Sequence, residues 1–510
     1  MAGGLVSDQV QDIEISNCEK EQIRIPGSIQ PHGALLVIKE GVIIGASANT
    51  DALLGMNAKE LQGKKIADFV NVTIVDRVSP VELVWNTGKD LKIFNGMAHQ
   101  NKDGLTILEL ESTGQNTPKP LNFYDIFSAA VTTIQKSPDI GALTENIVKM
   151  IRSITGFDHV MLYQFDQDCH GHVLAEDKIS SRPVYLNHHF PASDIPSQAR
   201  ELYLVNWARF IPDVDYQPCA LELKDKKEPL DLSFSILRSV SPVHIQYLRN
   251  MDVSASMSIS IIKDGKLWGL IVCHHTKALF LPYNYRNACM LLGHFFSLEL
   301  SSKEQQSQST ARLKLRKLMT AILERITFED DIPKGLLKDS GLLMDLMGSQ
   351  GAVLCFDGRM TLLGKTPDKE KVIALIEWMD KYNRKKAFAS DCLMGLYPPA
   401  QEFKDTASGI IAVPIPKAAN DYIIWFRPEH VHDLTWAGNP HEPVVAGNER
   451  SKFNPRNSFE SWKEILKFKS LPWEPVQIEA AHEIYDMISG LILKKHLLTQ
   501  IRAGKEMDKL

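Results

Sequence analysis

The feature that most constrains this fold is a long run of helical spacing between residues 284 and 327. Apolar residues recur there at the intervals of one helix face, and no proline interrupts them. A helix of this length is more typical of a bridge between domains than of a core helix. The run therefore predicts folded domains on both of its sides.

Length and composition agree with a multidomain globular protein. The chain has 510 residues, enough for about three or four domains of ordinary size, and 44% of them are hydrophobic. The net charge of -5 argues against nucleic acid as the main partner, because such binders concentrate Lys and Arg to neutralise phosphates.

Other features of the sequence indicate where such a chain works. The seven cysteines show no paired spacing, and no apolar stretch of about 18 or more residues appears. The polar N-terminus lacks the pattern of a signal peptide. We therefore expect a cytoplasmic protein without a disulfide framework or a membrane span.

Strand-like and helical segments with turn signals occur in three sets, which predict an α+β fold class with three antiparallel-sheet sensor domains joined by long helices. The first set comprises 33–47, 50–70 (helical), 91–99 and 104–112, before a polar linker at 113–120. The second set comprises the helical segments 123–137 and 140–156 and the strands 159–166, 172–179 and 256–275. The third set has strands at 351–358, 409–416 and 422–428.

Residues 476–510 predict a final helix. Its apolar residues follow helical spacing, interrupted by Lys495, at Ala481, Ile484, Ile488, Leu491 and Leu498. Such a stripe either caps the third domain or forms one strand of a two-stranded coiled coil. We favour the coiled coil, because the helix continues to the end of the sequence.

Several long motifs resemble one family. The chain resembles phytochromes in PASDIPSQARELY (191–203), LRSVSPVHIQYLRNM (237–251) and LWGLIVCHH (267–275). It resembles the chromophore-attachment arm of bacteriophytochromes in NCEKEQIRIPGSIQPHG (17–33), and the anchors of the phytochrome tongue in DLTWAGNPHEPV (433–444) and PRNSF (455–459). The resemblance covers nearly the whole chain in the order PAS, GAF, PHY.

The resemblance implies the domain organisation. The expected parts are an N-terminal arm (1–28), a PAS domain (29–121), a GAF chromophore-binding domain (122–314), a PHY domain (315–475) with a tongue at about 429–462, and a C-terminal helical linker (476–510). It also implies that the arm threads through a GAF loop at about 217–240 to form a knot. A homodimer through the helical spine and the C-terminal coiled coil is expected, because signalling needs two aligned output domains.

By this resemblance, Cys18 is the covalent anchor of a linear tetrapyrrole. Its thiolate would add to the A-ring vinyl group and form a thioether. Plant and cyanobacterial phytochromes instead attach a reduced bilin at a cysteine just before the GAF histidine, and here Val243 precedes His244. This departure favours biliverdin IX-alpha attached at Cys18. Taken alone, a cysteine next to Glu19 in a polar arm is unremarkable.

The propionates of such a ligand need cations and hydroxyls. The resemblance implies that Arg209 and Arg238 supply guanidinium groups, while Tyr203, Ser256 and Ser258 supply hydroxyls. The two serines are two apart on a predicted strand, so they should point to the same face.

The other expected contacts lie around the pyrrole rings. Asp194 would offer its backbone carbonyl to the pyrrole N–H groups, and Ile195 and Pro196 would pack on the rings. His244 would lie over the ring system, and His274 would hydrogen-bond the D-ring carbonyl. Around the ring that rotates, the resemblance implies Tyr163, Phe190, Tyr203 and Tyr247. Without the resemblance, core packing is the commoner role for such aromatic residues.

The tongue would supply the switch. By resemblance, Arg456 forms a bidentate pair with Asp194 in the dark, and Ser458 replaces it after red light rotates the D ring. Residues two apart share a strand face but point about 200° apart on a helix, so a hairpin-to-helix change would exchange them. Trp436 would likewise trade places with another tongue residue.

The sequence leaves the output open. It contains neither a kinase ATP-binding motif nor a GGDEF signature, so we expect no enzyme activity in this chain apart from autocatalytic chromophore attachment. Its last four residues, 507–510, resemble the opening of a diguanylate cyclase domain, and a histidine kinase is the alternative output.

Two other function classes and a metal site fit the sequence less well. A cyclic-nucleotide-binding GAF sensor would carry an Asn-Lys-x-x-Phe pattern, which does not occur. A cysteine-dependent enzyme using Cys18 and His32 would need an oriented base and an oxyanion hole. The His- and Cys-containing segments 169–172 and 273–275 lack the four-ligand spacing of zinc sites, so we expect no metal.

Overall fold

The computed structural model describes residues 21–70, 81–86, 90–113, 123–224, 230–329, 331–381, 387–416, 420–440, 456 and 458–507. Its contacts divide the chain into two units. The first comprises Met1–Lys303 and Thr435–Trp462, and the second comprises Glu304–Leu434 and Lys463–Leu510.

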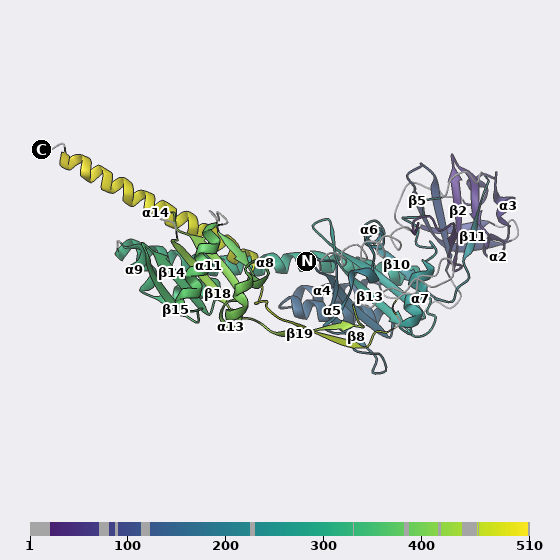
Figure 1. Ribbon diagram of the computed structural model, residues 1–510. Coiled ribbons are helices and arrows are strands. Elements are labelled where there is room, and N and C mark those ends of the chain that lie inside the picture. The colour runs from purple at the N-terminus through teal and green to yellow at the C-terminus, as the bar shows by residue number, and fades with distance from the viewer. Residues whose placement is uncertain are drawn as a thin grey trace, which may run out of the picture. The chain divides into compact units, whose positions relative to one another are not determined.

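The first unit contains a seven-stranded antiparallel sheet in the order β1-β11-β3-β2-β6-β5-β4 (Figure 1). Its strands are β1 (Ser28–Ile29), β2 (Gly33–Lys39), β3 (Val42–Ser47), β4 (Val81–Asn86), β5 (Leu91–Gln100), β6 (Thr106–Ser112) and β11 (Cys219–Leu223). Strand β11 comes from the predicted GAF loop, yet it pairs with β1 and β3.

The helical stretch predicted at 50–70 is broken into short pieces. These are α2 (Thr50–Leu54), α3 (Ala58–Leu61) and the 3-10 turn η1 (Ile66–Asp68). Helix α2 ends because Gly55 adopts a left-handed conformation with φ of 75°, which only glycine takes up easily.

A second sheet in the first unit has the order β10-β12-β13-β7-β8-β9-β19-β20. Its strands are β7 (His159–Phe165), β8 (Gly171–Lys178), β9 (His188–Phe190), β10 (Ala208–Ile211), β12 (Ala255–Lys263), β13 (Lys266–His275), β19 (His432–Ala437) and β20 (Ser461–Leu466). The tongue strands β19 and β20 therefore extend this sheet, and β19 pairs with β9 in parallel.

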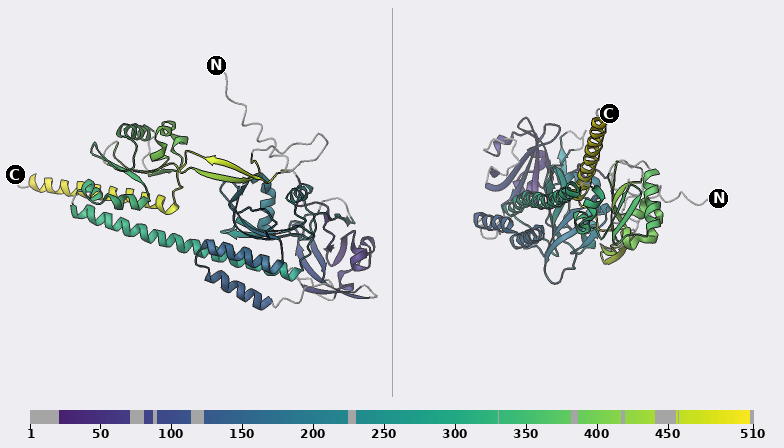
Figure 2. Two further views of the ribbon diagram at one scale, coloured as in Figure 1. Left: turned by 90° about the horizontal axis from the view of Figure 1, so that it is seen from below. Right: turned by 90° about the vertical axis from the view of Figure 1, so that its left-hand side faces the viewer.

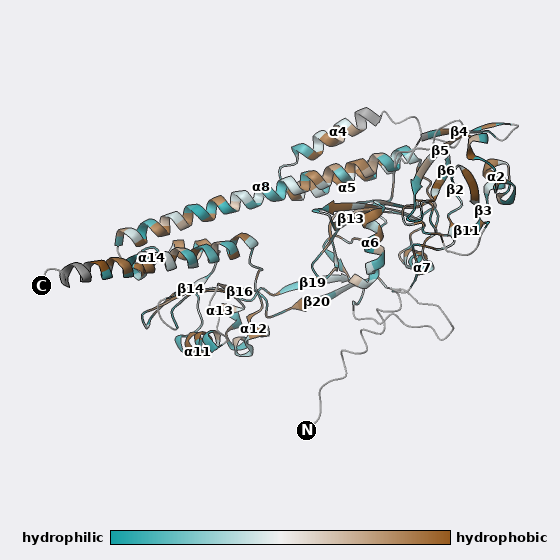
Figure 3. Cartoon of the chain, turned by 90° about the horizontal axis from the view of Figure 1, so that it is seen from above, coloured by the Kyte–Doolittle hydropathy of each residue, from teal (hydrophilic) through white to brown (hydrophobic). Residues whose placement is uncertain are grey.

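Helices cover this second sheet on one face. Helices α4 (Phe123–Lys136), α5 (Ile140–Thr155) and the first part of α8 (Tyr283–Glu329) lie side by side there (Figure 3). Strand β13 separates two environments, because Ile271 and Cys273 enter this helix-covered core while Leu270 and Val272 point to the other face. On that other face are η2 (Ala192–Asp194), α6 (Ser197–Val205) and α7 (Pro242–Asn250).

The second unit has a five-stranded sheet in the order β15-β14-β18-β17-β16. Its strands are β14 (Gly351–Phe356), β15 (Arg359–Gly364), β16 (Phe388–Ser390), β17 (Gly409–Pro414) and β18 (Tyr422–Arg427). Its helices are α9 (Ile332–Leu337), α10 (Ser340–Met347), α11 (Lys369–Lys381), α12 (Leu393–Leu396), η3 (Pro398–Phe403), α13 (Lys404–Ala407) and α14 (Pro475–Met507). Separate apolar cores fill the two faces of the sheet.

The predicted long helix is confirmed, because α8 runs without interruption from Tyr283 to Glu329 (Figure 2). The final helix α14 has two parts. Ala481, Ile484 and Ile488 are buried in the core of the second unit, as a capping helix requires. Farther along, apolar side chains are exposed at Leu493, Leu497, Leu498 and Ile501. None of the helices in the described part of the chain combines the length and apolar character needed to cross a bilayer.

Candidate ligand-binding site

A cavity of about 670 Å³ lies in the first unit, on the face of the second sheet that carries α6 and α7. Its volume is in the range of pockets that enclose small organic ligands. Most of the residues predicted for the site line it, namely Tyr163, Phe190, Asp194, Ile195, Pro196, Tyr203, Arg209, Arg238, His244, Tyr247, Ser256, Ser258 and His274, together with the predicted switch residue Arg456.

Two buried arginines belong to the cavity wall. Nη2 of Arg209 donates to the carbonyl of Arg238 at 2.7 Å, and Nη1 of Arg238 donates to the carbonyls of Leu232 and Ser233 at 3.1 and 3.0 Å. Burial lowers the pKa of Arg209, and burial with the neighbouring Arg209 lowers that of Arg238 to about 9. The guanidinium group of Arg238 therefore remains a cation at pH 7, and arginine side chains in general stay protonated in proteins.

One of these cations has a free donor. Nη1 of Arg209 is buried and has no hydrogen-bond partner among the described residues. A buried donor without a partner costs roughly 1–3 kcal/mol, so an anion in the cavity would relieve this cost. Strand pairing places Ser258 opposite Arg209 and Ser256 opposite His274, so hydroxyls lie next to both groups on the cavity face.

Two histidines of the cavity are neutral at pH 7. Burial and the nearby Arg209 lower the pKa of His244 to about 4, and burial and His159 lower the pKa of His274 well below its ordinary value. Nδ1 of His274 is buried without a partner among the described residues. A neutral imidazole carries one N–H donor, so His274 can donate to a carbonyl oxygen of a ligand.

Aromatic rings complete the wall near β7 and β9. The ring centroids of Tyr163 and Phe190 are 5.8 Å apart. The Tyr163 ring covers the backbone of Gly171, where an added Cβ would lie 1.5 Å from its Cζ, so no larger residue fits. Burial raises the pKa values of Tyr163 and Tyr247 far above the ordinary value, so both phenols stay protonated.

Asp194 connects the cavity with the tongue. Its Oδ2 accepts from Nη2 of Arg456 at 2.6 Å and from the hydroxyl of Tyr247 at 2.9 Å. Burial raises the pKa of Asp194, and Arg456 and Tyr247 oppose that rise. The expected bidentate geometry is wrong, because Nη1 of Arg456 donates instead to the carbonyl of Ala437 at 2.6 Å. One guanidinium group thus holds both the carboxylate and the strand β19.

Two histidines of β9 and His170, just before β8, contact the tongue strands. Trp436 lies opposite His189 in the pairing of β19 with β9, and its ring centroid is 5.8 Å from that of His189 and 5.3 Å from that of His170. On the other tongue strand, Oγ of Ser461 is 2.8 Å from Nε2 of His188. Trp436 is buried by these contacts but does not line the cavity.

A glycine allows the tongue to close this tightly. Gly438 has φ of 87°, and an added Cβ would lie 2.3 Å from the carbonyl oxygen of Ser458 and 3.0 Å from Nη1 of Arg456. The side chain of Ser458, the predicted exchange partner, is exposed and does not line the cavity.

The N-terminal arm lies between two stretches of the GAF loop. The carbonyl of Gly27 accepts from the amide of Leu221, and the carbonyl of Arg24 accepts from the amide of Leu232. These contacts on both sides agree with the predicted passage through the loop. Residues 225–229, which would close that loop, lie outside the described residues, so the knot stays a prediction.

Cys18, the predicted anchor, also lies outside the described residues. Two arm residues that follow it, Glu21 and Ile23, line the cavity, and so does Val243. Sequence reasoning missed both arm residues and the apolar wall formed by Met161, Val173, Leu202, Leu270 and Val272. Strand alternation around Tyr163 and His274 could have identified parts of this wall, but no sequence signal pointed to Glu21.

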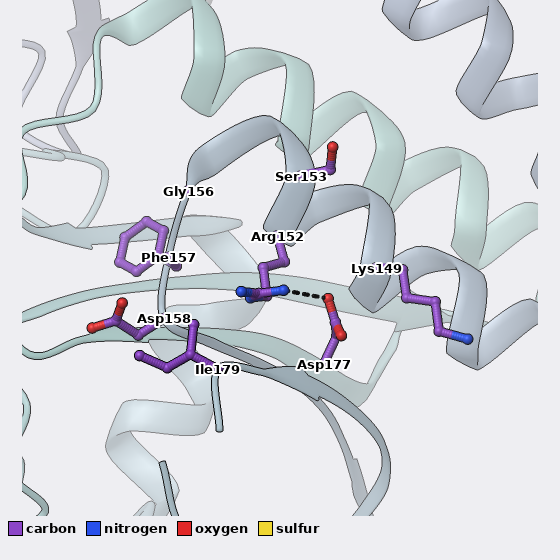
Figure 4. A pocket seen from close by; sticks show the side chains of 8 residues that line it. All are labelled: Lys149, Arg152, Ser153, Gly156, Phe157, Asp158, Asp177 and Ile179. Atoms are coloured by element: carbon purple, nitrogen blue, oxygen red, sulfur yellow. Dashed lines mark hydrogen bonds and ion pairs between the residues drawn. The ribbon is translucent and has the colours of Figure 1, made fainter. Parts of the chain in front are cut away.

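A smaller hollow of about 300 Å³ lies at the end of α5. Arg152 points toward Asp177 there, at 3.1 Å from Nη1 to Oδ2, while Lys149 points away from that pair (Figure 4). The arginine of this hollow is thus already paired with a carboxylate. Among the described residues, no three His, Cys, Asp or Glu side chains gather in a way that could hold a metal ion.

Comparison with known proteins agrees with this arrangement. Family models described as PAS fold, GAF domain and Phytochrome region match residues 18–113, 139–297 and 315–496. Cyanobacterial phytochrome B of Nostoc sp. is 39% identical, covering 97% of this chain and 69% of the relative, and the bacteriophytochrome of Pseudomonas aeruginosa is 31% identical, covering 93% and 66%. The chain thus spans about two thirds of the length of these relatives.

Solved structures agree over almost the full chain. The photosensory core module of the Stigmatella aurantiaca phytochrome has a TM-score of 0.81 at 39% identity, covering 94% of this chain and 98% of that one. A bacteriophytochrome from R. palustris has a TM-score of 0.83 at 35% identity, covering 94% and 99%. The fold and the cavity therefore define a PAS-GAF-PHY photosensory module. The chain belongs to the phytochrome family.

Members of this family bind a bilin, a linear tetrapyrrole with two propionates, and the cavity residues fit such a group. Arg209 and Arg238 are buried cations that suit carboxylates, and Nη1 of Arg209 is a donor without a partner among the described residues. Nδ1 of His274 is likewise available to a carbonyl oxygen. The apolar wall suits the pyrrole rings.

Proposed function

We propose that this chain covalently binds biliverdin IX-alpha through Cys18 and acts as a red/far-red photoreceptor. The observation that carries this proposal is a pair of buried nitrogens on the cavity wall that have no hydrogen-bond partner among the described residues, Nη1 of Arg209 and Nδ1 of His274. Carboxylates would satisfy the first donor, and a ring carbonyl would satisfy the second.

When bound, the bilin supplies light absorption and a double-bond isomerisation. The residues of the chain hold it in place: Arg209 and Arg238 bind the propionates, while Ile195 and Pro196 pack on the rings. Tyr203, Ser256 and Ser258 would offer hydroxyls from neighbouring elements, and His244, which is neutral at pH 7, would lie against the rings.

The choice of biliverdin rests on the anchor. Val243 lines the cavity at the position where phytochromes with a reduced bilin carry their cysteine, and its side chain offers no nucleophile. Cys18 precedes an arm segment that reaches the cavity at Glu21 and Ile23. The arm thus leads toward the ligand, which supports attachment from Cys18.

The tongue would convert the chemical change into movement. Arg456 holds Asp194 and Ala437 at once, so a changed hydrogen-bond pattern at Asp194 would loosen β19 as well. We propose that a refolded tongue brings Ser458 to Asp194 and moves Trp436 off His189. The exposed position of Ser458 leaves its side chain available for this exchange.

Helices α8 and α14 would carry the signal onward in a homodimer. The apolar side chains exposed along the end of α14 (Leu493, Leu497, Leu498 and Ile501) support a helical dimer contact there. We propose a diguanylate cyclase as the output of the complete protein, with a histidine kinase as the alternative. The free thiols at the described cysteines agree with a cytoplasmic location.

The central experiment mixes the purified apoprotein with biliverdin. We expect a red-absorbing adduct that survives denaturation and switches reversibly under red and far-red light. Cys18→Ala should lose the covalent bond, as mass spectrometry of the denatured protein would show. If no adduct forms, or if Cys18→Ala forms the same adduct, the proposed function is wrong.

A further inference from the structure

Glu21 makes a contact that the bilin-binding role does not explain. Its Oε2 accepts a hydrogen bond from the hydroxyl of Ser241 at 2.7 Å, and its side chain lines the cavity. Ser241 is the N-cap of α7, and the same hydroxyl accepts from the amide of Val243 at 3.2 Å. A serine hydroxyl can donate one hydrogen bond and also accept others. Here it donates to the Glu21 carboxylate of the arm and accepts from the backbone amide that it caps.

This contact ties the arm to the helix that forms part of the site. Helix α7 carries His244 and Tyr247 to the cavity, and its first turn also lines the cavity at Pro242 and Val243. The position of Glu21 is therefore fixed relative to the same element that would hold the ligand. Because a carboxylate acceptor strengthens a hydrogen bond, this link is stronger than a contact between neutral groups.

We propose that Glu21 is a positioning residue for chromophore attachment, and that its hydrogen bond with Ser241 holds the arm so that Cys18 reaches the cavity. The inference rests on the proposed attachment at Cys18. The two positions are three apart along the chain, so their Cα atoms are at most about 11 Å apart. With Glu21 held at the cavity wall, the thiol is confined to the neighbourhood of the site.

The other polar contacts of the arm are too far along the chain to replace this one. Among the described residues, the next polar contact between the arm and the rest of the protein is made by Arg24. Its carbonyl accepts from the amide of Leu232, and its Nη2 is 2.6 Å from Oε2 of Glu201. Without the Glu21 contact, the nearest such polar contact would lie six positions along the chain from Cys18 instead of three. Since effective concentration falls with about the −3/2 power of tether length, this doubling alone would slow attachment roughly threefold.

The attachment step itself needs no further reagent. The thiol of Cys18 adds across the vinyl C=C of the bilin: sulfur forms a bond to one vinyl carbon, and the π bond breaks. The thiol proton ends on the carbon framework that received the electron pair, so nothing is oxidised or reduced. Glu21 acts through the placement of Cys18, and its effect belongs to the rate of this addition rather than to ligand affinity.

The test measures covalent and non-covalent binding of biliverdin separately. Glu21→Ala should slow covalent attachment three- to tenfold, measured by mass spectrometry of samples quenched in acid. In the Cys18→Ala background, Glu21→Ala should lower the affinity for biliverdin by a smaller factor than the factor by which it slows attachment. A contact that only stabilises the fold would change both quantities, so an equal loss of affinity would overturn the proposal, as would a wild-type attachment rate in Glu21→Ala.

Two substitutions of Ser241 separate the arm contact from the helix cap. Asp and Asn cap helices about as well as Ser. Ser241→Asp would face Glu21 with a second carboxylate and should slow attachment like Glu21→Ala, whereas the amide of Ser241→Asn can donate to Glu21 and should keep a near-wild-type rate. Equal slowing in both variants would overturn the proposal, because the effect would then lie in the helix.

A matched control removes the other ion pair of the arm. Glu201→Gln breaks the contact with Arg24. Neither residue lines the cavity, and 63% of the Glu201 side chain is exposed. Its attachment rate should stay within twofold of the wild type. If the wild type itself formed no covalent adduct, the proposed function would fail before this inference; if it did, and only the Glu21 and Ser241 results failed, this inference alone would be wrong.

Discussion

Arg456 reaches Asp194 with one nitrogen and the backbone of Ala437 with another, and only 6% of the Arg456 side chain and 5% of the Asp194 side chain are exposed. This single guanidinium therefore joins a cavity residue to a tongue strand in a largely buried place. Breaking such a pair on one side leaves a buried charge without its partner, which costs about 3–5 kcal/mol. The docked tongue should thus respond sharply to a change at Asp194.

Substitution of Arg456 should release the tongue strands. Arg456→Gln leaves the carboxylate of Asp194 with Tyr247 alone, so we expect local opening of β19 and β20 to become easier by about 3 kcal/mol. Hydrogen exchange of amides 432–437 and 461–466 would measure this change. The double variant Asp194→Asn with Arg456→Gln should recover part of the loss, and unchanged protection in the single variant would contradict the role given to the pair.

Gly438→Ala should undock the tongue without changing any charge. The new Cβ would lie 2.3 Å from the carbonyl oxygen of Ser458, and φ of 87° is strained for alanine. We expect faster exchange in the same strands and a weaker contact of Trp436 with the sheet, visible in tryptophan fluorescence. Gly490→Ala on α14 is the control, because nothing lies within 4 Å of its added Cβ and it should be neutral or stabilising.

Arg209→Gln should weaken binding of the propionates specifically. A hydrogen bond to a charged group contributes about 1.5–3 kcal/mol, so the affinity for biliverdin should fall roughly ten- to a hundredfold. The dimethyl ester, which lacks both carboxylates, should bind the variant and the wild type within about threefold of each other. Arg249→Gln, which removes an exposed pair with Asp215, should change neither affinity. Equal losses for acid and ester would show that Arg209 only supports the fold.

The imidazole of His32 should make the protein less stable in acid. Burial lowers its pKa to about 3 with help from Arg286 and Arg209, whereas the unfolded chain has the ordinary value near 6.5. Below pH 6.5 this histidine is protonated in the unfolded state but not in the folded state. The free energy of unfolding therefore decreases as the pH is lowered from 6.5 to about 3. By pH 5.5 this costs about 1.4 kcal/mol.

A substitution isolates this contribution of His32 from other titrating groups. Burial raises the pKa values of Glu109 and Glu111, and raised carboxyl pKa values stabilise the folded state in acid, opposite in sign to the histidine. In His32→Gln, the drop in unfolding free energy between pH 7.5 and 5.5 should be about 1.4 kcal/mol smaller than in the wild type. Urea unfolding at the two pH values would measure it, and identical drops would exclude His32 as the cause.

Residues that share a strand face or a helix face were predictable from the sequence. Helix α8 follows from its spacing, and Ser256 and Ser258 reach the cavity together because strand side chains alternate. The segment KDG (263–265) between two apolar runs also predicts a hairpin turn, and Asp264 and Gly265 both have positive φ between β12 and β13. These features depend on neighbours in the chain, which the sequence shows directly.

Contacts between distant segments were decided by tertiary structure. Glu21 meets Ser241 across 220 positions, and Arg456 meets Asp194 across 262, while a second acceptor at Ala437 makes that pair monodentate. Likewise, β11 leaves its own domain in the sequence to pair with β1 and β3. The motifs indicated which residues belong to the site.

By itself, therefore, the sequence determined the three α+β domains, the long helix and the list of residues suited to a bilin. Only the tertiary structure decided which donors remain available and which polar side chains are already paired. Local periodicity sets faces, whereas hydrogen-bond partners depend on the directions in which separate elements approach one another. At Arg456, that approach divides one guanidinium group between Asp194 and Ala437.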